Sequence, residues 1–208
     1  MSKWLTIIGM GEDGWEGLSA RARHAIGTAE AIVGSSRLLG FLPQTKAEVH
    51  EWPQPFSAVV DRIRPLAGRS TVVLATGDPL NYGVARKLME FIPFAEMDII
   101  PHLSAFSLAA SRVGWSLPDC DTLTLHGRDA AHIEPFIQPG VRLIVLTADR
   151  TTIAEVARRL TARGFGKSEI TVLENMGGAR EYQSSFVADT PPSTDHSDLN
   201  TLAIHCVA

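Results

Sequence analysis

Short apolar segments alternate with segments of helical character along the chain, and this alternation restricts the fold more than any other feature. In the first half, apolar segments at residues 4–8, 31–33, 71–75 and 97–100 predict strands. Helices are predicted at residues 19–30, 56–66, 84–91 and 104–113. Ser19 and Ser104 stand at helix starts, where a hydroxyl accepts a hydrogen bond from a free first-turn amide. This alternation favours an α/β fold with a largely parallel sheet.

The second half also mixes strands and helices, after a stretch that interrupts regular structure. Residues 114–121, GWSLPDCD, are rich in turn-forming residues and indicate a domain boundary. Strands are predicted at residues 122–125, 141–147, 169–173 and 201–207, with a helix at 153–163 and a hairpin strand at 181–187. We therefore expect two α/β domains, residues 1–114 and 115–208.

Charge and hydropathy exclude several classes of protein. The 208 residues carry a formal net charge of −4, which argues against a general nucleic-acid binder. No apolar stretch approaches the ~20 residues that span a bilayer, and the N-terminus lacks the features of a signal peptide. A cytoplasmic protein without a membrane partner is therefore expected. Cys120 and Cys206 are far apart and form no CxxC motif, so neither a zinc site nor a disulfide framework is expected.

A glycine-rich turn follows the first predicted strand. Gly9, Gly11 and Gly14 spell GxGxxG, which is typical of dinucleotide-binding proteins. Two features argue against that interpretation: residues 15–18 separate the third glycine from the helix start, and no acidic residue follows the second strand at Gly34. A nicotinamide or flavin oxidoreductase remains an alternative, and so does a tight turn that merely needs small residues.

A second glycine-rich segment, residues 75–83 (ATGDPLNYG), follows the buried strand at 71–75. Gly77 allows a ligand to approach the backbone closely, and Asp78 is held extended by the proline after it. The segment is not a P-loop, because no GK[ST] follows. In parallel sheets, ligands bind beyond the carboxyl ends of the strands, and both glycine-rich segments are predicted to lie there.

Taken in order, these segments resemble those of the tetrapyrrole methyltransferase family. Residues 9–14 (GMGEDG) resemble the GxGPGD turn of the family, and residues 77–83 (GDPLNYG) match its GDP-x-x-[YF]-G segment. Residues 101–105 (PHLSA) resemble its PG-[IV]-S-[SA] signature. Residues 173–177 (LENMG), followed by Glu181, resemble a stretch of the precorrin-6Y C5-methyltransferase branch. Two departures stand out: Glu12-Asp13 replaces Pro-Gly, and His102 replaces a glycine.

The resemblance implies a fold, a methyl donor and a donor site. The family binds S-adenosylmethionine, folded, in a cleft between two α/β domains. The donor contacts implied for this chain are Gly11, Glu12, Thr76, Gly77, Asp78, Asn81, Tyr82, Ser104, Ala105, Thr147, Ala148, Asn175, Met176 and His205. Asp78 would face the positive charge of the donor or cap the helix that follows. No metal is implied.

The resemblance also implies the reaction, the addition of a methyl group to C-5 of a precorrin-6 intermediate in cobalamin biosynthesis. Positioning of the reactants can supply much of the acceleration. Tyr82 and His126 are the leading candidates for moving the proton that leaves C-5, with His102 and Glu174 behind them. The substrate carries carboxylates, which require local cations, and the candidates are Arg37, Arg112 and, first among them, Arg128.

Partners and alternatives follow from the same resemblance. A homodimer is expected, and the chain is either a stand-alone enzyme or one half of a fusion whose other half methylates C-15 and removes a carboxylate. One alternative is a methyltransferase of the same fold that acts on another tetrapyrrole position, on uroporphyrinogen, or on a protein or RNA. A further alternative is a non-catalytic partner subunit, which the altered Glu12-Asp13 turn favours.

Overall fold

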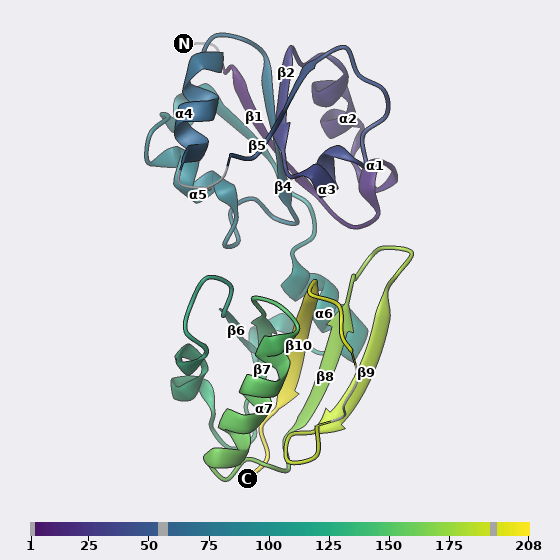
Figure 1. The fold of residues 1–208 in the computed structure, drawn as a ribbon, viewed down its shortest axis with the longest axis vertical. Helices are drawn as coiled ribbons and strands as arrows, with labels where there is room; N and C mark the ends of the chain where they lie inside the picture. Colours follow the sequence, from purple (N-terminus) through teal and green to yellow (C-terminus); the bar gives the residue numbers. More distant parts are fainter. Residues whose placement is uncertain (1–2, 54–57, 192–194) are drawn as a thin grey trace. The chain divides into compact units, whose positions relative to one another are not determined.

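The computed structural model describes residues 3–53, 58–191 and 195–208 and divides the chain into two compact units, between Ser104 and Ala105. Each unit has its own sheet (Figure 1). Each of the two sheets has five strands. The expected boundary, after Gly114, lies later in the chain than this division. No helix in the described part of the chain combines the length and the apolar character needed to cross a bilayer.

The first unit contains a sheet in the order β3-β2-β4-β1-β5. Its strands are β1 (Leu5–Met10), β2 (Ala31–Gly34), β3 (Glu48–Glu51), β4 (Thr71–Thr76) and β5 (Met97–Ile100). Every pairing in it is parallel, which confirms the expectation for the first half. Strand β3 was not predicted, because its sequence EVHE is polar and mostly exposed at the edge of the sheet.

Helices cover both faces of the first sheet. They are α1 (Gly14–Gly17), α2 (Ala20–Gly27), α3 (Ser36–Leu39), α4 (Val59–Ile63) and α5 (Val84–Met89), with 3-10 turns at Arg64–Leu66 and Phe94–Glu96. Alternate strand residues point to opposite faces: Ile7 packs with α4 and α5, and Ile8 packs with α2. The two cores so formed are both apolar.

Two predicted helices of this unit differ in length from the expectation. The hydroxyl of Ser19 accepts from the amide of Ala22 at 3.2 Å, which confirms the cap of α2, but α2 ends at Gly27. Of the predicted helix at 56–66, residues 56 and 57 lie outside the described residues. The rest divides into α4 and a 3-10 turn, because Pro65 has no amide hydrogen to continue an α-helix.

The second unit contains a mixed sheet in the order β6-β7-β10-β8-β9. Its strands are β6 (Asp121–Thr124), β7 (Arg142–Leu146), β8 (Glu169–Glu174), β9 (Tyr182–Val187) and β10 (Asn200–His205). Strands β6 and β7 are parallel, and the other pairs are antiparallel. The β8–β9 pair confirms the predicted hairpin. Further 3-10 turns lie at Leu117–Asp119 and Ala130–Phe136.

Helices α6 (Ala105–Val113) and α7 (Thr151–Ala162) pack on opposite faces of the second sheet. Helix α7 buries Val156 and Leu160 against one face. Helix α6 buries Phe106 and Ala109 in a cluster with Ile144 of β7 on the other face. The chain therefore divides before α6, because this helix supplies an apolar layer that the second sheet needs.

We predict that Phe106→Ala destabilises the second unit by about 3–5 kcal/mol, since it deletes a buried aromatic ring from this layer. Urea denaturation followed by circular dichroism measures the effect. Ser111→Ala, on the exposed side of the same helix, is the control and should change stability little. Equal stability of Phe106→Ala and the parent chain would mean that α6 does not belong to this core.

Candidate functional site

The carboxyl ends of the central strands meet at one edge of the first sheet. Met10 at the end of β1 lies beside Thr76 at the end of β4, and the amide of Gly77 donates to the carbonyl of Met10 at 2.9 Å. Strand β5 ends beside β1 at Ile100. The two glycine-rich segments therefore lie together at the carboxyl ends of their strands, as the sequence predicts. The loop at residues 101–104 lies beside them.

Two glycines allow these loops to touch. A Cβ atom on Gly9 would lie 2.0 Å from the carbonyl oxygen of Gly77 and 2.6 Å from the amide nitrogen of His102, far inside contact distance. Gly77 has φ +60°, a conformation that side chains disfavour. The edge is thus built largely from bare backbone, whose donors and acceptors suit an adenine ring or an amino-acid group.

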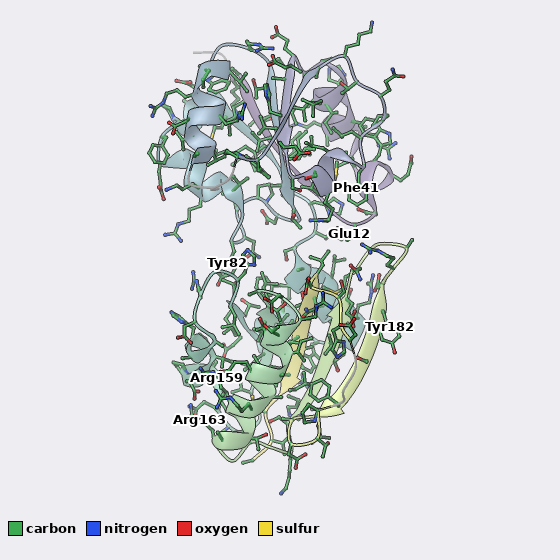
Figure 2. The ribbon with its side chains drawn as sticks, viewed as in Figure 1. Glu12, Phe41, Tyr82, Arg159, Arg163 and Tyr182 are labelled. Carbon is green, nitrogen blue, oxygen red and sulfur yellow. The ribbon has the colours of Figure 1, made fainter. Side chains whose placement is uncertain are left out.

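The loop after β4 is tightly folded. The carboxylate of Asp78 accepts from the amide of Leu80 at 2.9 Å, which is a local turn contact. Asp78 is also the residue predicted to face the positive charge of the donor. Tyr82 has φ +57° and is half exposed. Figure 2 labels it in the first unit. A tyrosine in the left-handed region costs of the order of 1–3 kcal/mol and is typical of functional loops. Asn81 and Thr76 are exposed beside it.

The first glycine turn differs from the expectation in one respect. Gly14 begins the short helix α1, so the third glycine of GxGxxG does open a helix, contrary to the sequence argument. The second argument against a dinucleotide site stands, because β2 ends at Gly34 and continues with Ser35. Helix α1 has only four residues and ends at Gly17, and Leu18 separates it from the cap of α2 at Ser19.

Arg37, predicted to bind substrate, makes contacts within the first unit instead. Its guanidinium pairs with the carboxylate of Glu12, and it donates to the hydroxyl of Thr76 at 2.9 Å. Glu12 was predicted to contact the donor, yet only 10% of its side chain is exposed. Figure 2 shows Glu12 and Tyr82 in the first unit. This geometry does not support Arg37 as a ligand for the substrate.

The second unit gathers its predicted residues at one edge of its own sheet. Strands β6, β7 and β8 end there, because Thr124 lies beside Leu146 and the start of β10 at Asn200 lies beside Glu174. The loops at this edge hold most of the predicted residues: His126, Arg128, Thr147, Ala148, Asn175 and Met176. His126 and Arg128 are exposed, in the loop after β6.

His205 does not belong to this edge. It lies at the far end of β10, beside Arg142 at the start of β7 and Glu169 at the start of β8. At about 3.3 Å per residue, that position is more than 10 Å along the strand from Asn200. His205 therefore lies at the opposite edge from the other predicted residues, because β10 runs antiparallel to β7 and β8. The donor contact at His205 stays a prediction.

Several predicted side chains at the edge hold the loops together. The hydroxyl of Thr147 donates to the backbone oxygen of Asn200 at 2.8 Å and lies 2.9 Å from its side-chain oxygen. Asn175 has φ +47° and accepts from the hydroxyl of Ser197 at 3.3 Å. Met176 is buried against α6. Thr147 and Met176 thus support the edge through buried contacts.

A buried carboxylate organises the loop before β10. Glu174 lies 2.7 Å from the imidazole of His196 and accepts from the amide of Ser197 at 2.8 Å. Both side chains are about nine-tenths buried. The sequence suggested Glu174 only for proton transfer. It did not suggest His196, because nothing in the sequence around His196 indicates that this histidine is buried.

Glu181 joins the loop after β8 to helix α6. Its carboxylate accepts from the amide of Gly177 at 2.7 Å and pairs with Arg112, whose Nη2 lies 3.1 Å away. The hydrogen bond from Arg112 lowers the pKa of Glu181 below its ordinary 4.5. Burial raises the pKa by less, and the hydrogen bond from the Gly177 amide lowers it further. Arg112, predicted to bind substrate, is thus held in an ion pair. Ser104 and Ala105 flank the start of α6.

We predict that Glu181→Gln makes the protein less sensitive to acid. A carboxylate with a lowered pKa in the folded state stabilises above its ordinary pKa, and that stability is lost as pH falls. Urea denaturation at neutral pH and from about pH 5 to about pH 3 should show lower initial stability and a shallower decline. Glu90→Gln, which removes an exposed carboxylate, should decline like the parent. A parental acid profile for Glu181→Gln would contradict this assignment.

Comparison with known proteins shows the family to which the chain belongs. The family model for Tetrapyrrole (Corrin/Porphyrin) Methylases matches residues 4–188. The chain is 40% identical over 189 residues to a decarboxylating precorrin-6Y C(5,15)-methyltransferase from Sinorhizobium sp, covering 90% of this chain and 46% of that protein. The chain therefore spans about half the length of that relative.

A shorter relative is matched along most of its length. The chain is 29% identical over 177 residues to the cobalt-precorrin-7 C(5)-methyltransferase of Salmonella typhimurium, covering 85% of this chain and 87% of that protein.

Solved structures share the fold. A precorrin-6Y methylase of cobalamin biosynthesis from Archaeoglobus fulgidus is 24% identical, with a TM-score of 0.78 and full coverage of both chains. A uroporphyrin-III C-methyltransferase from Thermus thermophilus, complexed with S-adenosylhomocysteine, is 14% identical with a TM-score of 0.72, covering 97% of this chain and 96% of that one. These two likenesses establish the fold alone.

Proposed function

Because the chain belongs to the tetrapyrrole (corrin/porphyrin) methylase family, we propose that it transfers a methyl group from S-adenosylmethionine to C-5 of a precorrin in cobalamin biosynthesis. One observation carries the choice of C-5. The chain covers 87% of a relative named for C(5) alone, but about half of a relative named for both C-5 and C-15. The match to a relative named for C(5) alone, along most of its length, supports the choice of C-5 for this chain.

The residues present fit the methyl donor. At the edge of the first sheet, Gly9 and Gly77 leave backbone where side chains would otherwise stand, and Thr76 is exposed beside them. In this proposal the first unit holds the donor through Gly11, Thr76, Gly77, Asn81 and Tyr82. The donor contacts at Ala148 and Asn175, in the second unit, stay predictions from the family resemblance. S-adenosylmethionine supplies an electrophilic methyl group, so the chain's own task is to hold and orient it.

The chain's residues otherwise bind the macrocycle and move one proton. Orientation alone can supply effective molarities of about 10⁵–10⁸ M, so no nucleophile from the protein is needed. Arg128 is exposed at the carboxyl edge of the second sheet and is the proposed ligand for a substrate carboxylate. His126, exposed two residues earlier, is the proposed acceptor of the C-5 proton, since imidazole exchanges protons near neutral pH. Tyr82, in the loop after β4, is the second residue proposed for this proton transfer.

The donor proposal is tested by titration calorimetry of the purified chain with S-adenosylhomocysteine and, separately, with NAD. We expect binding of S-adenosylhomocysteine in the micromolar range and none of NAD. Binding of NAD alone would restore the oxidoreductase alternative that GxGxxG raises. If neither ligand binds, the donor site is refuted and the non-catalytic alternative gains support.

The substrate proposal is tested with Arg128→Ala. Loss of one charge-assisted contact should raise KM for the precorrin about tenfold to a hundredfold and leave the Kd for S-adenosylhomocysteine unchanged. The matched control is Arg158→Ala, which removes an exposed arginine from α7. An unchanged KM in Arg128→Ala would exclude this arginine from the substrate site.

The proposal also includes two partners, a C-15 methylating and decarboxylating protein or domain and a second copy of this chain. The name of the Sinorhizobium relative supports a C-15 methylating and decarboxylating activity that works beside this chain. The family resemblance supports a homodimer in the cytoplasm. Light scattering of the purified protein should then give twice the 22.5 kDa of one chain, and a mass of one chain would exclude the dimer.

A further inference from the structure

The turn after β1 carries two adjacent acidic residues that contact different neighbours. Glu12 pairs with Arg37 of α3, which follows β2. Asp13 lies 3.6 Å from the imidazole Nε2 of His102, in the loop after β5. We call the two contacts together the turn clamp. It connects the loop after β1 with the loops that follow two other strands of the same sheet.

The Glu12 half of the turn clamp reaches three segments. The carboxylate is almost buried, with 10% of the side chain exposed, and so needs a cation beside it. Arg37 supplies that cation and also donates to the hydroxyl of Thr76 at the end of β4, at 2.9 Å. A single guanidinium thus joins α3, the turn and the loop that begins the GDP segment.

The Asp13 half is enclosed by glycines. A Cβ atom on Gly11 would lie 2.6 Å from one carboxylate oxygen of Asp13 and 2.9 Å from a ring carbon of His102. A Cβ atom on Gly17 would lie 2.0 Å from the other oxygen. Any side chain at either glycine would displace the carboxylate, so the two glycines leave room for Asp13 to reach His102.

The clamp residues coincide with the departures of this sequence from the family pattern. Glu12 and Asp13 stand where the pattern has Pro-Gly, and His102 stands where it has a glycine. In the structure, the replaced positions contact each other, through Asp13 and His102. A proline stiffens a turn through its fixed φ. Here side-chain contacts restrain a turn that lacks the proline.

We infer that Arg37 and His102 are positioning residues that act through Glu12 and Asp13 to hold residues 10–14 in the conformation that receives the methyl donor. This inference rests on the proposed function, because donor binding is its readout. Arg37 then affects the affinity for the donor and has no direct role in binding the macrocycle. The altered turn is on this view a working donor loop, and the chain is not a non-catalytic relative.

The test is a double-mutant cycle on the Kd for S-adenosylhomocysteine, with Glu12→Gln, Arg37→Gln and the double variant. Each single variant should weaken binding about tenfold, and the double variant should be no weaker than either single one. The same pattern is expected for Asp13→Asn with His102→Gln. If the Kd of the Glu12–Arg37 double variant rises by the product of the two single-variant factors, the two residues act independently. That result would overturn the inference.

A matched control is the ion pair of Arg21 with Asp98, which joins α2 to β5 in the same unit. Arg21→Gln and Asp98→Asn should leave the Kd unchanged. Arg37→Lys keeps the charge but loses the planar fork that reaches both Glu12 and Thr76, so it should bind with intermediate affinity even if Arg37→Gln fails to fold. If Arg37→Gln raises KM for the precorrin while the donor Kd stays parental, Arg37 is a substrate ligand and the inference is wrong.

Amide hydrogen exchange separates this inference from the proposed function. Without any ligand, Glu12→Gln should speed exchange of the amides at residues 10–14 about tenfold, while the amides of β10 stay unchanged. If the parent chain does not bind S-adenosylhomocysteine but the exchange result holds, the proposed function fails and the turn clamp stands. Unchanged exchange in Glu12→Gln would remove the turn clamp, whatever the chain binds.

Discussion

The contact of bare backbone at the carboxyl edge of the first sheet is the constraint on which the rest of the site depends. Gly9 lies so close to the carbonyl of Gly77 that a single added methyl group would separate the two loops. Parallel strands bring these loops to one edge, and the absence of side chains lets them touch. This contact makes the edge suitable for a ligand with many polar atoms. In our proposal, side-chain contacts then hold the turn after β1 in the conformation that receives the methyl donor.

In the second unit, carboxylates hold the loops at the edge together. Its sheet is mixed, so fewer strands have their carboxyl ends at one edge than in the parallel first sheet. Glu174 holds His196 and the loop before β10, and Glu181 holds both the turn at Gly177 and Arg112 of α6. These acids explain why the LENMG stretch and the later glutamate occur together. Glu181 also pairs with Arg112. Arg128 is the predicted arginine that we propose for the substrate.

The sequence predicts strands well where apolar β-branched residues are continuous and buried, as in β4, and poorly where a strand is polar, as in β3. The site was predicted only in part, because ion pairs depend on tertiary contacts. Glu181, the partner of Arg112, is 69 residues away in the sequence, and the residues near Arg112 do not indicate this ion pair. The position of His205 at the opposite edge of the second sheet could not be predicted, because a strand-like pattern does not reveal the direction in which the strand runs.

The position of the transferred methyl group tests the central claim most directly. The purified chain would be incubated with precorrin-6Y and S-adenosylmethionine carrying a carbon-13 methyl group, and the product examined by NMR. The account predicts one new labelled methyl group, at C-5, with the substrate's carboxylates all retained. A label at C-15, loss of a carboxylate, or a labelled product at any other carbon would contradict it.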